Sequence, residues 1–296
     1  MNDEFYIGWQ SDAPANTGRW IRRTVILLLA LAVALSLLLA VAQRTIGASV
    51  FEWGKVKSFS GILKNQPYPH LLVPRPGTGS PPSFSSYYLV NPFKFGFDSE
   101  LAAKLDGRMV SLKGTLIYRG NQTMIEVVEG SLTTNHDSTI LNDSTAPLSL
   151  GPQKLVGEIV DSKCYLGVMN PGALTPHRAC AIRCISGGIP PVLLVRQTNG
   201  PALYFLLVSR DGKPVNKQVL GLVAEAVEIS GEVERHGELL ILRADPADYR
   251  RLSNSASNVA FDRKGSAPQL DQLVNAKANC FHESSSRQIH QGSTTF

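Results

Sequence analysis

The apolar pattern of the chain starts with one long uncharged run. Residues 24–42 hold no charged side chain over 19 positions. As an α-helix this run would be roughly 28 Å long, close to the hydrocarbon thickness of a bilayer. It therefore predicts a transmembrane helix over 24–42, preceded by a cytoplasmic N-terminal segment over 1–23.

The charges that flank this run predict its orientation. Arg19, Arg22 and Arg23 precede it, whereas only Arg44 follows closely. The positive-inside rule then places the N-terminus in the cytoplasm and the rest of the chain across the membrane. The alternative is a cleaved secretory signal, because the residues 40–42 (Ala-Val-Ala) are typical of a cleavage site. Both interpretations export the same domains.

Beyond the membrane, two similar stretches alternate apolar and polar residues with period two. GRMVSLKGTLIYRGNQTMIEV (107–127) and AEAVEISGEVERHGELLIL (224–242) align at a constant offset of 117. Alternation broken by glycine turns predicts strands. Each copy also has a helical candidate after its third strand, at 99–105 (capped by Asp98) and at 217–223.

Five strands with a helix after the third are typical of the OB-fold. The predicted fold class is therefore mainly β: an N-terminal transmembrane helix followed by two tandem OB-like β-barrel domains, over 50–147 and 152–248. The second copy has about 26 extra residues between its first two strands, a Cys/His insertion over 163–188. The polar segment 253–296, which contains Cys280, is expected to be a disordered tail.

The insertion carries the side chains best suited to chemistry. His177, Cys180 and Cys184 are spaced i, i+3 and i+7, so a helix would place them on one face, and Cys164 precedes them across a Gly- and Pro-rich loop. Three thiolates and an imidazole suit a tetrahedral zinc site, and soft thiolates also favour Cu(I). We therefore predict that Cys164, His177, Cys180 and Cys184 are metal ligands for copper or zinc.

The same residues fit two other interpretations. A disulfide from Cys164 to Cys180 or Cys184 would be a structural staple, which is usual for exported cysteines. Alternatively, Cys180 and Cys184 could cycle as a redox pair, with His177 and Arg183 lowering the pKa of a neighbouring thiol. Asp161 and Lys163, near Cys164, could orient a ligand or pair with each other, but we expect them at a solvated strand end.

The composition and the motifs argue against some classes of function. The chain has 296 residues, 43% hydrophobic and 18% charged, with a net charge of +5 spread without a dense basic run. Nucleic-acid binding is therefore not indicated. No phosphate-binding loop, dinucleotide fingerprint or nucleophile-base motif is present in the sequence, so no catalytic residue is predicted and an enzyme is not favoured.

The string CYLGVMNPG...HRACAIRCISGGIPP resembles a family of uncharacterised bacterial proteins, exported or membrane-anchored, that share CY...HxxCAxxC before a Gly-Pro turn. The Cys180–Cys184 spacing resembles the CxxxC of exported copper chaperones that serve cytochrome oxidase assembly. The architecture is similar to the OB-fold haem chaperones of the periplasm. The resemblance to the uncharacterised family implies a bacterial origin and a functional cluster.

Together the observations predict a single-pass protein of the bacterial inner membrane with its C-terminal domains in the periplasm. The Cys/His site would bind a metal or undergo thiol redox chemistry in support of a membrane protein complex. The alternative is a non-catalytic structural or partner-binding subunit whose cysteines form a stabilising disulfide.

Overall fold

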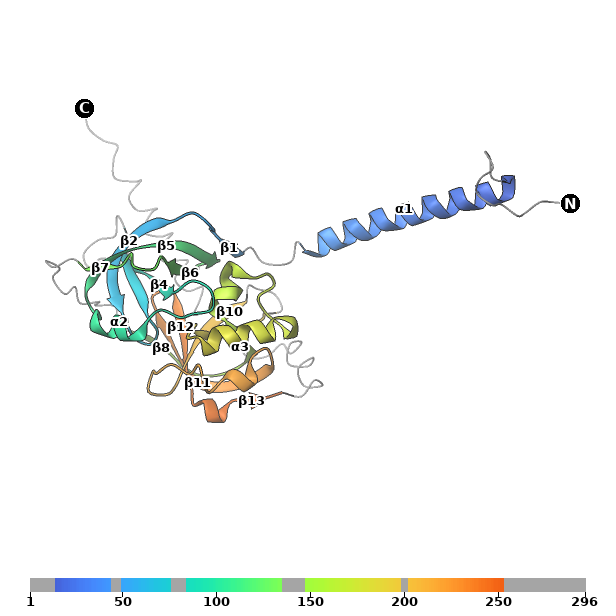
Figure 1. The fold of residues 1–296 in the computed structure, drawn as a ribbon. Coiled ribbons are helices and arrows are strands. Elements are labelled where there is room, and N and C mark those ends of the chain that lie inside the picture. Colours follow the sequence, from blue (N-terminus) through green and yellow to red (C-terminus); the bar gives the residue numbers. More distant parts are fainter. Residues whose placement is uncertain (1–13, 44–48, 76–83, 135–146, 198–201, 253–296) are drawn as a thin grey trace, which may run out of the picture. The chain divides into compact units, whose positions relative to one another are not determined.

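A computed structural model describes residues 14–43, 49–75, 84–134, 147–197 and 202–252 of the chain (Figure 1). The predicted tail 253–296, with Cys280, lies outside the described residues. The chain divides into two compact units, Met1–Gly47 and Ala48–Phe296.

The described residues of the first unit, 14–43, form the helix α1 over Ala15–Gln43. It includes the whole predicted span 24–42 and begins nine residues earlier, where Arg19 bonds the carbonyl oxygen of Ala15 and the side chain of Asn16. By length and composition α1 can cross a membrane; a secretory signal near the N-terminus would have the same properties.

The second unit begins with a closed five-stranded barrel. Strands β2, β3, β4, β6 and β5 pair in that order and β5 pairs again with β2; all pairs are antiparallel except β4 with β6. The short strands β1 and β7 each pair with β5 in antiparallel orientation. The elements of this first barrel are β1 (Ser49–Phe51), β2 (Lys57–Lys64), β3 (His70–Pro74), β4 (Phe84–Val90), α2 (Ser99–Lys104), β5 (Met109–Arg119), β6 (Gln122–Val127) and β7 (Thr133–Thr134).

A second closed barrel follows with the same strand order. Strands β8, β9, β10, β12 and β11 form the ring, and the parallel pair is β10 with β12. Its elements are β8 (Leu148–Asp161), the π-helix η1 (Cys164–Val168), the 3-10 helix η2 (Thr175–His177), α3 (Arg178–Ser186), β9 (Pro191–Val195), β10 (Leu203–Val208), the 3-10 helix η3 (Leu220–Leu222), β11 (Ala226–His236), β12 (Leu239–Arg243), the 3-10 helix η4 (Pro246–Asp248) and β13 (Arg250–Arg251).

The predicted fold class is confirmed: the protein is mainly β, with one N-terminal apolar helix and two five-stranded barrels of OB-like strand order. β5 and β11 begin and end at positions that differ by 117 residues. Gly120 and Gly237, also 117 residues apart, both have φ of 59°, the left-handed conformation that a tight hairpin turn requires of them.

The two helical predictions had different outcomes. α2 forms where expected, and the Asp98 carboxylate accepts hydrogen bonds from the backbone N–H groups of Glu100 and Leu101, as an N-cap should. The helical candidate at 217–223 forms only in part: the segment is a turn followed by the short 3-10 helix η3. It contains two valines and a glycine, which have low helix propensity, and no side chain caps its start.

The insertion is packed between the barrels. Each barrel has its own apolar interior, and a third buried cluster joins residues of both with the segment that follows β8. Tyr68 spans this junction: its hydroxyl donates to the carbonyl oxygen of Leu207 at 3.2 Å and accepts from the N–H of Val215 at 3.1 Å. The cysteine segment is therefore fixed by both barrels.

Candidate metal centre

Local structure brings the three described cysteines to one place. β8 ends at Asp161, and the chain turns at once into η1, which begins with Cys164. It returns through η2 into α3, where Cys180 and Cys184 lie one turn apart. At Gly187 the backbone N–H closes the last turn of α3 on the carbonyl oxygens of Arg183 and Cys184.

The three sulfur atoms form a compact group. The Sγ atoms of Cys164, Cys180 and Cys184 all lie within 4.8 Å of one another, and those of Cys164 and Cys180 are 3.9 Å apart. A disulfide bond is about 2.05 Å long, so all three cysteines are free thiols. Cys164 and Cys184 are buried, whereas Cys180 is partly exposed. Solvent thus reaches the group from the side of Cys180.

His177 belongs to a second, overlapping group. Its Nε2 atom lies 3.0 Å from Oδ2 of Asp161, and Oδ1 of Asp161 accepts the backbone N–H of Cys164 at 2.8 Å. Asp161, Cys164 and His177 have potential ligand atoms within 4.8 Å of one another, and all three residues are buried. The four predicted donors therefore do not form one compact set; Cys164 is shared by two groups.

The expectation of a solvated strand end at Asp161 and Lys163 was wrong. Asp161 is 0% exposed and Lys163 is 1% exposed. The Lys163 ammonium lies 2.6 Å from the Glu126 carboxylate on β6 and donates to the carbonyl oxygens of Asn91 and Phe93. These buried charges are held by partners in the packed junction, which the local sequence does not reveal.

Tyr165 also ties the segment to both barrels. Its ring stacks on that of Tyr204 in β10 with centroids 5.8 Å apart. The guanidinium of Arg119, from β5 of the first barrel, lies 4.3 Å above the Tyr165 ring. The position of neighbouring Cys164 is therefore fixed by aromatic and cation-π contacts as well as by Asp161.

One residue at the cluster, Lys94, is not among those that the sequence predicts. It lies between β4 and α2 of the first barrel, yet its Nζ donates to Sγ of Cys180 at 2.8 Å and lies 3.9 Å from Sγ of Cys184. Phe93 and Phe95, on either side, are exposed. Nothing in the sequence around Lys94 signals chemistry, because its role depends on how the two barrels pack.

The pKa values of Cys164 and Cys184 are shifted in opposite directions. The hydrogen bond to Cys184, with burial next in importance, raises the pKa of Cys164. The same bond lowers the pKa of Cys184, and Lys94 also contributes to that lowering. The bond to Cys180 raises the pKa of Lys94, which stays cationic. The cluster thus favours a negatively charged sulfur facing a lysine ammonium.

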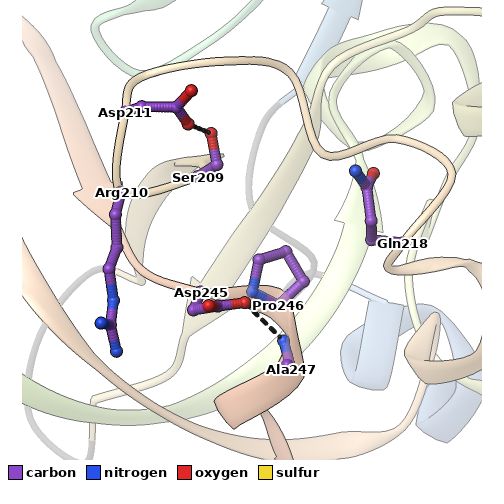
Figure 2. A pocket seen from close by; sticks show the side chains of 7 residues that line it. All are labelled: Ser209, Arg210, Asp211, Gln218, Asp245, Pro246 and Ala247. Carbon is purple, nitrogen blue, oxygen red and sulfur yellow. Dashed lines mark hydrogen bonds between the residues drawn. The ribbon is translucent and has the colours of Figure 1, made fainter.

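A separate hollow of about 610 Å³ lies on the second barrel (Figure 2). It is lined by residues of the loops that follow β10 and β12, including Ser209, Asp211 and Asp245. As Figure 2 shows, Ser209 bonds Asp211, and Asp245 accepts the backbone N–H of Ala247. The side chains of Ser209, Asp211 and Asp245 are thus bonded to other residues that line the hollow. No cysteine or histidine lines it. The sulfur cluster is the better candidate site.

Three soft donors within 4.8 Å of one another, supported by a buried Asp-His pair and by a lysine, could bind a metal ion. The donor set does not by itself identify the metal. No protein-family model and no curated protein matches this chain.

Proposed function

We propose that the protein binds a single soft metal ion, copper or zinc, through Cys164, Cys180 and Cys184. The observation that carries the proposal is the arrangement of three unbonded sulfur atoms within 4.8 Å of one another. Metal–sulfur bonds are about 2.3 Å long, so a metal among the three requires only sub-ångström to ångström side-chain adjustments.

The surroundings support a binding site more than a structural staple. Asp161 fixes both the backbone of Cys164 and the ring of His177. Partners of this kind commonly orient the residues of metal sites. Cys180 is partly exposed, which gives an incoming ion access.

Within this proposal α1 anchors the protein in the bacterial inner membrane, with the barrels in the periplasm. The three arginines before the apolar run support that orientation. A metal-binding domain tethered there would serve a membrane redox complex. The exposed Phe93 and Phe95 beside the cluster are suited to contact with such a protein partner.

Thiol redox chemistry is the second candidate, and the 3.9 Å separation of the Cys164 and Cys180 sulfurs favours it. The two thiols would form one disulfide and release two electrons and two protons to an oxidising partner. Lys94 donates to Sγ of Cys180 and so places a positive charge beside the pair.

Metal content and free thiols of the full-length protein, purified anaerobically in detergent, distinguish these functions. The proposal predicts about one copper or zinc ion per chain, and protection of the three thiols from alkylation until a chelator removes the metal. A reversible Cys164–Cys180 disulfide without metal would instead support the redox function. A permanent disulfide would show a structural staple.

A further inference from the structure

The cluster receives a positive charge from the barrel that does not contain the cysteines. Lys94 projects from the loop between β4 and α2 of the first barrel onto Cys180 and Cys184 of the second. Lys163 is close in sequence to the cluster, but its ammonium is already paired with Glu126. Among the described lysines, Lys94 alone is bonded to a cysteine sulfur.

The Lys94 loop is held by Lys163, just before η1, and by the C-terminal end of α3. Lys163 donates to the carbonyl oxygens of Asn91 and Phe93, on the N-terminal side of Lys94. On the other side, the N–H of Gly96 donates to the carbonyl oxygen of Gly187 at 2.9 Å. A Cβ atom at Gly187 would collide with the carbonyl oxygen of Lys94. Residues of both barrels thus hold Lys94 in contact with the sulfur atoms.

We propose that Lys94 makes the three-cysteine site selective for a monovalent soft ion, Cu(I), over Zn(II). This inference rests on the metal-binding function proposed above. Three thiolates with Cu(I) carry a net charge of −2, whereas the same thiolates with Zn(II) carry −1. A cation in contact with the sulfurs stabilises the more negative complex more strongly.

The ratio of the two metal affinities does not depend on the metal-free state. Both metals bind the same metal-free protein, so its protonation and charge cancel in the ratio of the two affinities. What remains is the interaction of Lys94 with complexes that differ by one unit of charge. At the dielectric constant of bulk water, one more unit of charge about 4 Å from the lysine ammonium changes the metal-binding constant about fivefold.

Competition titrations on the full-length protein in detergent, under anaerobic conditions, test this role. Cu(I) is partitioned against bicinchoninate and Zn(II) against a chromophoric zinc chelator, and the ratio of the affinities is compared between variants. Lys94→Met should lower the Cu(I)/Zn(II) ratio by about fivefold or more. Lys94→Arg, which keeps the charge, should restore most of that ratio.

Lys213→Met is the matched control, because it removes another exposed lysine, one that is paired with Asp211 and not with a cysteine. It should leave the ratio unchanged. If the wild type binds both metals and Lys94→Met has the same ratio as this control, the selectivity role is wrong while metal binding stands. If the wild type binds neither metal, the proposed function fails and the selectivity role fails with it.

Discussion

The ammonium of Lys163 lies 2.6 Å from the carboxylate of Glu126, so the residue that precedes Cys164 is paired with strand β6 of the first barrel. The side chain of Lys163 is 2% exposed and that of Glu126 is 14% exposed. The start of the cysteine segment is thus held by a charge in the other barrel.

Glu126→Gln should destabilise the protein, because it leaves the buried Lys163 ammonium without a countercharge. Loss of one partner from a fully buried pair costs about 3–5 kcal/mol; since Glu126 is partly exposed, we expect about 2 kcal/mol. Chemical denaturation followed by fluorescence measures the change. Glu129→Gln, which alters an exposed carboxylate just after β6, is the control. Equal stability of the two variants would contradict the structural role of the pair.

Gly96→Ala should weaken the junction between the Lys94 loop and α3. An added Cβ at Gly96 would collide with the carbonyl oxygen of Gly188. Forcing backbone apart in a packed contact costs about 1–3 kcal/mol. Gly221→Ala is the control, since no atom lies within 4 Å of its added Cβ and its φ is not positive. Thermal unfolding compares the two, and a Gly96→Ala melting temperature as high as the control's would refute the close packing.

Metal binding should release protons and strengthen as pH rises. The raised pKa of Cys164 keeps its thiol protonated at neutral pH, whereas a metal ligand must be a thiolate. Each proton released makes the affinity rise about tenfold per pH unit. Calorimetry at one pH in buffers of different ionisation enthalpy counts these protons. Binding heats that do not depend on the buffer would contradict this account.

The cysteines should contribute more to metal affinity than His177 does. Cys184→Ser removes a ligand, whereas His177→Gln removes a group that the structure pairs with Asp161. Loss of a supporting residue usually lowers metal affinity 10- to 100-fold, so we expect that range for His177→Gln and a larger loss for Cys184→Ser. Competition titration measures both. A larger loss for His177→Gln would show that the histidine is a direct ligand, as the sequence predicts.

The sequence predicts the barrels well because their signals are local. Alternation of apolar and polar positions, glycine turns such as those at Gly120 and Gly237, and the Asp98 cap each determine their own stretch of chain. The cysteine spacing likewise predicts a helix with Cys180 and Cys184 on one face, and the structure has α3 there.

The rest of the site depends on contacts between residues far apart in sequence. Lys94 and Cys180 are 86 positions apart, and Lys163 and Asn91 are 72 positions apart. Only the packing of the barrels brings these pairs together, so no local pattern marks Lys94 as part of the cluster. The same packing buries Asp161 and Lys163, which sequence reasoning places at the surface.

X-ray absorption spectroscopy at the metal edge tests the central claim most directly. The full-length protein, loaded anaerobically with Cu(I) in detergent, should show a first shell of three sulfur atoms at about 2.3 Å. It should lose sulfur atoms from that shell in Cys180→Ser. A first shell made of oxygen and nitrogen, or one unchanged by Cys180→Ser, would show that Cys164, Cys180 and Cys184 do not form the metal site.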